Sequence, residues 1–408
     1  MRAPLPTTPA KTPSDQFRHR ERAVFIACSL ALFFGQGVVF AGLGVALQAM
    51  AAEGGWSAGE AGAAFTAMIV AACIAATLPV WSIGRFGGRR TMTAGALLMA
   101  TGFLVAARAE TPALACLATA LAGGGFSLLA NTPAFTMISG WSGDRAGPRF
   151  GLYLTAGALG NAVGPIAAQA ATAALGWRGY WYGTAALALL LAAVLHSLLR
   201  EPPARAANAG APRQPLRALR SYAYGVMACA MILTQTALMT VFSAAPGHLS
   251  TAGWAAGASA AALGAQGMFG AAATAIGGFL LARTGTRAML IAALAAQAVG
   301  LVALALATRP AVTLLFVPAF GLGTALVTLA VTVMLVEHFG RRAGTAGLAL
   351  IWTLAGAASA GPWAAGLIAD ATGSYAPALW ALAASLLPLT VASALIRRPA
   401  DPSANAII

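Results

Sequence analysis

The chain has 408 residues, of which 59% are hydrophobic and only 8% are charged, and its formal net charge is +14. Soluble domains carry about 25% charged residues, so this composition excludes a soluble domain with an ordinary polar surface. The apolar residues form long uncharged runs such as Ala23 to Met50. A helix needs roughly 20 apolar residues to cross the bilayer core, where its backbone groups must be satisfied within the segment. These runs therefore predict transmembrane helices.

Charged and turn residues divide the chain into twelve predicted spans. The first six spans cover residues 23–50, 58–82, 91–108, 112–138, 150–175 and 178–199. The last six cover residues 222–246, 258–282, 287–307, 311–337, 343–370 and 376–397. The predicted domains are an N-terminal tail (1–22), a six-helix bundle (23–199), a linker (200–220), a second six-helix bundle (221–397) and a C-terminal tail (398–408). The expected fold class is an all-α membrane protein whose twelve helices form two pseudo-symmetric bundles.

Short motifs recur in the same order about 198 residues apart. The pairs are Gly55–Gly59 with Gly253–Gly257, Arg85–Arg89 with Arg283–Arg287, Arg145–Gly147 with Arg342–Gly344, and Gly164-Pro165 with Gly361-Pro362. This internal repeat indicates two copies of one membrane unit. Such an architecture typically moves a solute between its halves.

Arginine and lysine are distributed unevenly between the two sets of loops. Of these 24 residues, only Arg108, Arg178 and Arg309 fall in the odd-numbered loops. The positive-inside rule then places both termini and the linker in the cytoplasm, as in a multi-pass protein of a bacterial plasma (inner) membrane. The arginines lack interleaved aromatic residues, so no nucleic-acid partner is predicted. The sequence also shows no metal constellation, phosphate-cradling loop or nucleophile–base pair, so neither a cofactor, an enzyme activity nor an ATP-driven pump is expected.

The turn after the second span reads Gly84-Arg85-Phe86-Gly87-Gly88-Arg89-Arg90. It is similar to the cytoplasmic signature of the major facilitator superfamily, Asp-Arg-x-Gly-Arg-Arg. Together with the six-plus-six spans and the basic central loop, it makes nearly the whole chain resemble that superfamily. Gly84 and, in the second half, Ala282 occupy the acidic place of the signature, so its usual latch is expected to be missing. The resemblance implies that a set of arginines orders the cytoplasmic gate. The alternative is that they only anchor the protein at the lipid headgroups. These arginines are Arg85, Arg89, Arg90, Arg145, Arg283, Arg287, Arg341 and Arg342.

The fifth span carries Gly151, Gly160 and Gly164-Pro165. This is similar to the glycine-and-proline motif of antiporters in the superfamily, although its closing Gly-Gly is absent. Gly160 and Gly164 share one helix face and permit close approach of another helix. We expect these residues, with Gly361 and Pro362 in the second half, to act in helix packing or hinging. Packing at the interface between the halves is favoured over antiport.

Two branch likenesses within the superfamily are weak. Gly55-Trp56-Ser57 and Gly253-Trp254 resemble the monocarboxylate and oxalate/formate porters, but the basic residue that pairs a carboxylate in those families has no counterpart here. Drug antiporters often carry an acid in span 1 and an arginine in span 4, and this chain has neither. The carboxylates Glu60, Glu337 and Asp370 all fall at span ends. Glu60 and Asp370 are the candidates for titration from a water-filled vestibule.

Neutral polar side chains are therefore the candidates for recognising a solute. In the superfamily, spans 1, 4, 7 and 10 line the central path. An amide both donates and accepts hydrogen bonds, which suits a hydroxylated, amide-bearing or weakly polar solute. The alternative for each residue is an interhelical hydrogen bond. The predicted cavity residues are Gln36, Asn131, Gln235, Thr236, Thr328 and Thr332, with Gln266, Trp352 and Asn161 as further candidates.

The favoured hypothesis is a secondary transporter that moves a small organic solute by alternating access, as a monomer in the lipid bilayer and with or without a coupling ion. Proton-linked efflux of drugs or metabolites and uptake of a small carboxylate stay open as modes of transport. A membrane sensor or scaffold that binds without moving solute is the alternative from another class.

Overall fold

A computed structural model of the protein describes residues 13–143, 146–202, 221–354, 356 and 359–396. The first half of the chain begins with α1 (Pro13–Gly35), the π-helix η1 (Gln36–Ala41) and α2 (Leu43–Gly54), which form one crossing. The second crossing consists of α3 (Ala58–Ile74), the 3-10 turn η2 (Ala75–Thr77) and α4 (Leu78–Phe86). Then follow α5 (Gly88–Ala106), the pair α6 (Pro112–Leu129) and α7 (Thr132–Ser142), and α8 (Ala146–Leu198), which crosses twice because it is broken at Gly176.

The second half repeats this order. Its elements are α9 (Tyr222–Thr251), α10 (Ala256–Thr284), α11 (Thr286–Ala305), α12 (Pro310–Thr313) and α13 (Phe316–Leu354), which is broken at Gly340. The last crossings are completed by α14 (Ala360–Thr372) and α15 (Ala376–Ala394). The twelve predicted crossings and the two six-helix bundles are thus confirmed. The first crossing begins at Pro13, ahead of the predicted boundary at residue 23.

Nine helices in the described residues are long and apolar enough to cross a membrane. Three further crossings make up the twelve. Arg149–Leu198 counts as one of the nine but is two helices joined at Gly176. The helix α5 is less apolar because Arg89 and Arg90 lie in its first turn. The remaining crossing begins after Gly340 and ends in α14.

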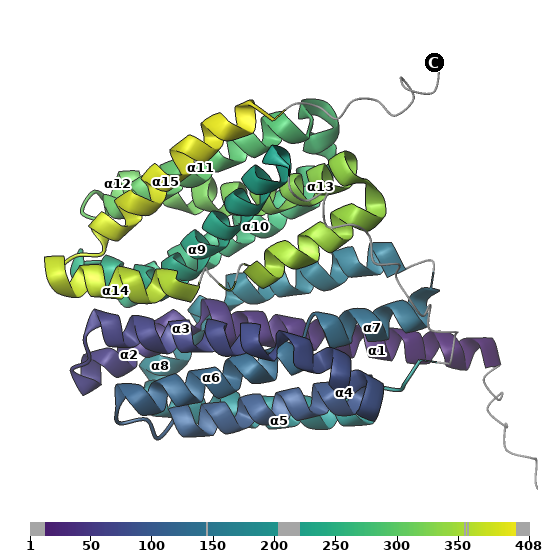
Figure 1. The fold of residues 1–408 in the computed structure, drawn as a ribbon. Helices are drawn as coiled ribbons and strands as arrows, with labels where there is room; N and C mark the ends of the chain where they lie inside the picture. Colours follow the sequence, from purple (N-terminus) through teal and green to yellow (C-terminus); the bar gives the residue numbers. More distant parts are fainter. Residues whose placement is uncertain (1–12, 144–145, 203–220, 355, 357–358, 397–408) are drawn as a thin grey trace, which may run out of the picture.

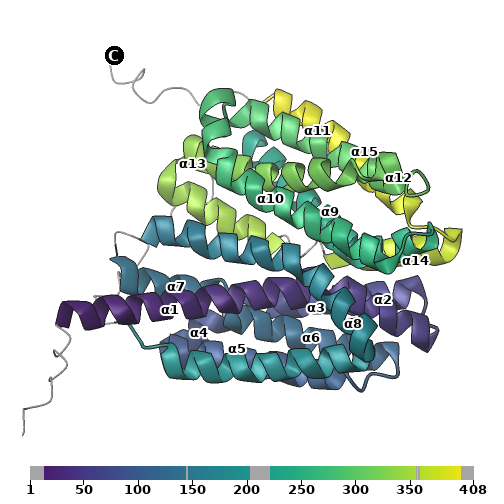
Figure 2. The ribbon, with the colours of Figure 1, turned by 180° about the vertical axis from the view of Figure 1, so that it is seen from behind.

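The two bundles lie side by side along their whole length, the first half below and the second half above in Figure 1, and the reverse view agrees (Figure 2). The start of α1 and the end of α15 lie at one end of the molecule, which we call the terminal end. The turns at Gly55, Gly253 and Gly373 lie at the other, which we call the opposite end. The first apolar core lies around Phe65, Phe103 and Trp181 and the second around Leu294, Phe320 and Leu335. The first core also includes Met239 and Phe242 of α9, so the cores meet at this helix. Because each core consists mostly of residues from its own half, the two halves can move largely as rigid bodies.

The glycines with positive φ reproduce the sequence repeat. In the described residues they are Gly55, Gly87, Gly143 and Gly176 in the first half and Gly253, Gly285, Gly340 and Gly373 in the second. They pair at separations of 198 or 197 residues, the same as in the sequence. Residues with a Cβ rarely adopt this conformation, so glycine fixes the turn at each of these helix ends. The repeat therefore extends to the backbone of four equivalent turns.

Candidate functional site

The halves approach each other closely where α3 runs along α14. A Cβ added to Gly62 would lie 2.4 Å from the carbonyl oxygen of Pro362, and one added to Gly366 would lie 2.3 Å from that of Ala58. Neither glycine can be replaced here without separating the helices. Pro362, predicted to serve helix packing, therefore lies at the interface between the halves, in a contact that we call the α3–α14 seam.

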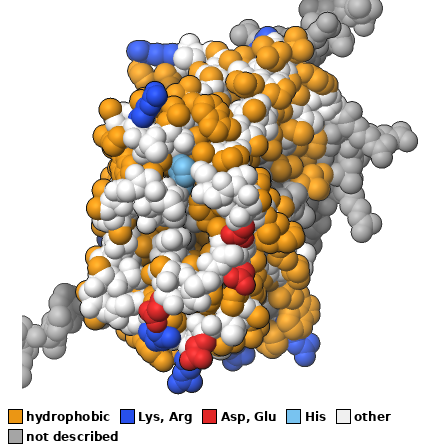
Figure 3. Space-filling view, turned by 90° about the vertical axis from the view of Figure 1, so that its left-hand side faces the viewer, with side chains coloured by type: hydrophobic (Ala, Val, Ile, Leu, Met, Phe, Trp, Pro, Cys, Tyr) orange, Lys and Arg blue, Asp and Glu red, His pale blue; other side chains and the backbone are white. Residues whose placement is uncertain are grey.

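Asp370 joins the halves at the opposite end of this seam. Its Oδ1 accepts a hydrogen bond from the backbone N–H of Ala58 and its Oδ2 accepts one from that of Gly59, both at 2.8 Å. These N–H groups belong to the first turn of α3 and have no partner within the helix. A carboxylate at this position also interacts favourably with the positive end of the helix dipole. Figure 3 looks onto this end, where acidic and basic side chains stand among apolar and uncharged surface.

The same helix end carries a carboxylate from its own half. Ser57 Oγ accepts from the N–H of Glu60 at 3.2 Å, and Glu60 Oε2 accepts from the N–H of Ser57 at 2.8 Å, which is a capping box. Glu60 and Asp370, the two predicted candidates for titration, therefore cap one helix from opposite halves. Nearby, burial and then the charge of Asp370 raise the pKa of Tyr375 to about 12. Its hydroxyl therefore stays protonated at neutral pH.

The seam continues away from Asp370 toward the terminal end. Thr66 Oγ1 donates to the carbonyl oxygen of Ser359 at 2.6 Å and accepts from the N–H of Trp363 at 3.3 Å. Further along, a Cβ added to Gly356 would lie 3.1 Å from the sulfur of Cys73. From Ala58 to Cys73 the seam follows α3 for about 22 Å at 1.5 Å per residue. The closure between the halves therefore reaches deep into the crossing.

Two further contacts join the halves outside this seam. At one, α2 meets α9, where a Cβ added to Gly44 would lie 1.8 Å from the carbonyl oxygen of Phe242. At the other, α8 runs along α10. Positions Gly264 and Gly267 of α10 lie against the backbone of Ala162 on α8, where added Cβ atoms would lie 2.6 and 2.8 Å away. The side-chain oxygens of Asn161 and Gln266, at the same level, are buried without a hydrogen-bond partner. Both residues were predicted to line the path. In this conformation they lie inside the closed contact instead.

The terminal end differs from the opposite end. In the described residues, four hydrogen bonds join the halves, and all of them lie in the α3–α14 seam. Arg85 and Arg283 are exposed and lie over the rings of Phe86 and Phe279 of their own halves. Arg89 Nη2 contacts His196 Nε2 at 2.7 Å, again within one half.

Of the remaining predicted gate arginines, the structure describes the side chains of two. Arg90 and Arg287 are exposed. Arg145 lies outside the described residues, as do the side chains of Arg341 and Arg342, whose backbone belongs to α13. The role of these arginines as a gate stays a prediction.

Glu201 supplies a carboxylate next to the signature turn. Its Oε1 and Oε2 accept from the N–H groups of Arg89 and Gly88 at 2.9 and 3.2 Å, so it caps α5. In the second half Glu337 Oε2 accepts from Thr286 Oγ1 at 2.8 Å, at the start of α11. The sequence signature has glycine and alanine in its acidic place, but the folded protein brings an acid to the adjacent helix start from elsewhere in each half. Both contacts were missed because these acids lie more than 50 residues from the turns.

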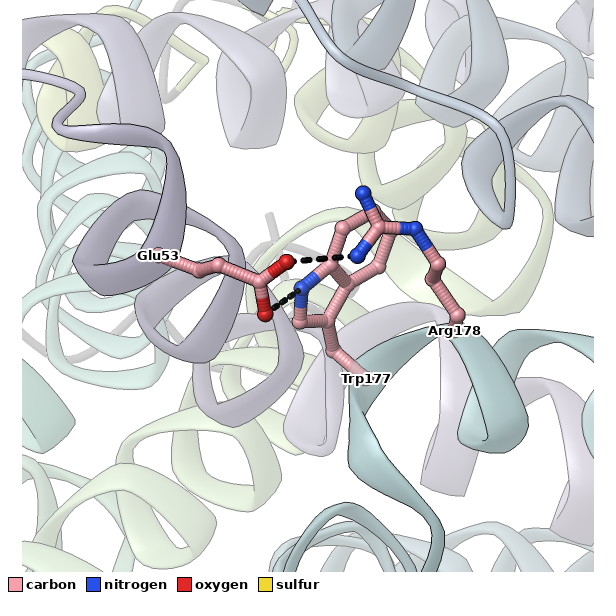
Figure 4. A network of polar contacts seen from close by, with 3 residues as sticks. All are labelled: Glu53, Trp177 and Arg178. Atoms are coloured by element: carbon pink, nitrogen blue, oxygen red, sulfur yellow. Dashed lines mark hydrogen bonds and ion pairs between the residues drawn. The ribbon is translucent and has the colours of Figure 1, made fainter.

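Two charged contacts tie the ends of the first half. At the terminal end Arg149 Nη2 lies 3.2 Å from Glu21 Oε1, and Glu21 is only 3% exposed. At the opposite end Glu53 accepts from Trp177 Nε1 at 2.9 Å and from Arg178 at 2.5 Å (Figure 4). The guanidinium of Arg178 also lies 4.0 Å from the centre of the Trp177 ring. These contacts join the first crossing to α8, and they stabilise the first half as a unit.

Two predicted cavity residues lie at irregular points of the helices. Gln36 is half-buried and begins the π-helix η1, while Asn131 is exposed and separates α6 from α7. Asn131 has a φ of 53°, and it is the one non-glycine residue with positive φ in the part of the chain that the structure describes. Its N–H donates to Tyr153 Oη at 3.1 Å, and Gln36 packs against Gly157 one turn further along α8. Such strained or π-helical positions concentrate at functional sites.

The second half contributes half-buried hydroxyl and amide groups. Thr236, Thr328 and Thr332 each donate to the carbonyl four residues earlier in their own helix, which leaves each oxygen able to accept. Gln235 is half-buried, and Trp352 is 46% exposed. These positions agree with a lining role, which stays a prediction.

Gln297 of α11 was missed by the sequence reasoning. It is fully buried, accepts from Thr234 Oγ1 at 2.9 Å and contacts Thr324 Oγ1 at 3.3 Å. It thereby ties α9 and α13 together through α11. No spacing pattern in the sequence links these three residues.

The glycine motif in span 5 was predicted to pack at the interface between the halves, and this prediction was wrong. Added Cβ atoms at Gly160 and Gly164 would lie 2.3 Å from the carbonyl oxygens of Phe33 and Gly37, so these glycines pack α8 against the first crossing of their own half. The other face of α8 meets α10. Gly151 is exposed with nothing within 4 Å of an added Cβ, so its predicted packing role is wrong too.

Pro165 is buried within α8, and its role in packing or hinging stays a prediction. Gly361 packs against Thr236 and Thr240 of its own half, in the position that Gly164 has in the first half.

A family model described as Major Facilitator Superfamily matches residues 26–360. The chain belongs to this superfamily. Similar solved structures include a bacterial homologue of the human lysosomal transporter Spinster in an inward-facing and occupied conformation (TM-score 0.75, 13% identity, covering 94% of this chain and 96% of that one). A variant of the nucleoside transporter NupG is also similar, with a TM-score of 0.74 and 15% identity, covering 91% of this chain and 99% of that one. So is a D-xylose–proton symporter, with a TM-score of 0.74 and 15% identity, covering 92% of this chain and 97% of that one. At these identities the likeness establishes the fold. No curated protein sequence matches the chain significantly.

Proposed function

We propose that this protein is a secondary transporter that moves a small neutral polar solute by alternating access, with its terminal end in the cytoplasm. The observation that carries the proposal is the one-sided closure. The α3–α14 seam and its Asp370 clamp join the halves from the opposite end inward. The described terminal-end contacts of Arg85, Arg89, Arg283, Glu201 and Glu337 all stay within one half.

The orientation follows from charge. The terminal end carries nearly all of the basic residues, which the positive-inside rule places in the cytoplasm. A protein closed at the opposite end then presents its path to the cytoplasm. Rocking of the two separately packed halves would break the Asp370 clamp and join the gate arginines at the terminal end.

The chemistry of the proposed lining favours a neutral solute. Gln36, Asn131 and Gln235 offer amides, and the threonines of α9 and α13 offer hydroxyls. The carboxylates Glu60, Asp370 and Glu337 lie at helix ends rather than midway along a crossing. Two of the similar structures are a nucleoside transporter and a D-xylose–proton symporter, and hydroxylated solutes of that size suit amide and hydroxyl groups.

Solute counterflow in proteoliposomes tests the proposal. The liposomes are loaded with unlabelled D-xylose, uridine or lactate, and uptake of the same labelled compound is followed. We expect counterflow of a hydroxylated solute and none of lactate. Binding detected by thermal shift without counterflow of any bound compound would support a sensor and overturn the proposal.

A further inference from the structure

A groove opens on the outer surface of the first half near the terminal end. It has a volume of about 360 Å³ and is lined by Leu78, Trp81, Ser82, Phe86, Arg90, Thr91, Ala94 and Leu128. It exists because the second crossing is interrupted by the 3-10 turn η2 and resumes as α4, which packs on α5, α6 and α7 of its own half. All of the groove's lining residues belong to the first half.

The walls of the groove are apolar and aromatic. Trp81 is 62% exposed, Leu78 47% and Phe86 46%, and all three belong to a segment apolar enough to cross a membrane. The rings of Trp81 and Phe86 are in edge contact with centroids 5.7 Å apart. The groove's two hydroxyls bond to each other, since Thr91 Oγ1 donates to Ser82 Oγ at 3.2 Å. An apolar chain can therefore occupy the groove without burying an unsatisfied polar group.

The mouth of the groove is positively charged. Arg90 lines it and is exposed, and Arg85 lies 5.8 Å from the centre of the Phe86 ring. In the described residues neither arginine has a carboxylate partner. Gly84 occupies the acidic place of the signature, and Glu201 is engaged by the N–H groups that begin α5. Both guanidinium groups are therefore available to an anion from outside the chain.

We propose that this groove holds one anionic phospholipid from the leaflet at the terminal end, with its phosphate on Arg90 and Arg85 and an acyl chain along Leu78, Trp81 and Phe86. Arginine pairs with phosphate through two parallel N–H bonds, and a basic cluster at the headgroup level selects anionic lipid. The second half keeps Arg283 at the position equivalent to Arg85 but has Ala288 at the position equivalent to Arg90, so it lacks the paired charge. The site therefore belongs to one half only, unlike the repeated turns. It does not depend on the identity of the transported solute.

The test measures lipid retained by the purified, delipidated protein in native mass spectrometry after titration with phosphatidylglycerol or phosphatidylcholine. We expect Arg90→Gln to weaken phosphatidylglycerol binding roughly tenfold, as for the loss of one charge-assisted contact. Ala94→Trp keeps the charge but fills the groove, because Ala94 lines it and is exposed, and should abolish binding. The matched controls are Arg287→Gln and Ala292→Trp, exposed positions in the second half.

Both controls should bind phosphatidylglycerol as the wild type does. Thermal unfolding checks that each variant is folded. If Arg90→Gln does not fold, the binding measured with Ala94→Trp tests the proposal. Unchanged binding by the groove variants would overturn the proposal. So would equal binding of phosphatidylcholine, or an equal loss in the second-half controls, which would indicate attraction to net charge alone.

Discussion

Replacement of Asp370 by alanine should loosen the closure between the halves. It removes two hydrogen bonds of 2.8 Å to the first turn of α3 and one negative charge at that helix end. A buried charged hydrogen bond contributes about 1.5–3 kcal/mol, but Asp370 is exposed, so water replaces part of each bond. We take about 0.5 kcal/mol for each bond and a similar amount for the helix dipole, about 1.5 kcal/mol together. That corresponds to roughly a tenfold shift toward the open seam.

Hydrogen exchange followed by mass spectrometry measures this shift at two places. The N–H groups of Ala58 and Gly59 lose their acceptor directly in the variant. The N–H of Trp363 does not touch Asp370 but donates to Thr66 across the seam. If the halves move as rigid bodies, peptides that contain Trp363 should also exchange about tenfold faster.

The matched control is Glu60→Ala. Glu60 caps the same helix end but contacts only Ser57 of its own half. It should speed exchange at Ser57 and leave Trp363 unchanged. The reasoning is refuted if Asp370→Ala affects only Ala58 and Gly59, because the carboxylate would then be a local cap rather than a clamp between halves.

Further variants test the packing and the proposed lining. Gly164→Val should place methyl groups against Gly37 and abolish transport while lowering the thermal unfolding temperature, because the added Cβ alone would lie 2.3 Å from a carbonyl oxygen. Gln297→Leu should lower the free energy of unfolding by about 1–3 kcal/mol because it leaves buried hydroxyls unpaired, which thermal unfolding in detergent can measure. Asn131→Ala and Gln235→Ala should each raise the KM of solute counterflow severalfold, and unchanged uptake in both would show that the proposed lining is wrong.

The sequence predicted the scaffold well because each of its signals is local. Runs of apolar residues fix the crossings, and glycines such as Gly55 and Gly253 fix turns that need positive φ. Basic loops predicted an orientation from charge alone. These signals depend on neighbours in the chain rather than on tertiary contacts.

The contacts that close the protein could not be predicted in this way. Asp370 and Ala58 are 312 positions apart, and only the docking of the two halves brings them together. The spacing of Gly160 and Gly164 showed a face for close packing but not which helix would occupy it. Glu201 was not identified as the cap of α5 because its role depends on where the chain returns after the sixth crossing.

A reversible crosslink across the seam tests the central claim most directly. In Gly356→Cys the new Cβ would lie 3.3 Å from the Cβ of Cys73 and 3.1 Å from its sulfur, close to the geometry of a disulfide. Oxidation should then hold the opposite end closed, and solute counterflow should fall to the level of empty liposomes and recover on reduction. The same variant with Cys73→Ser should be insensitive to the oxidant. Full counterflow through the crosslinked protein, with the disulfide verified by mass spectrometry, would contradict alternating access.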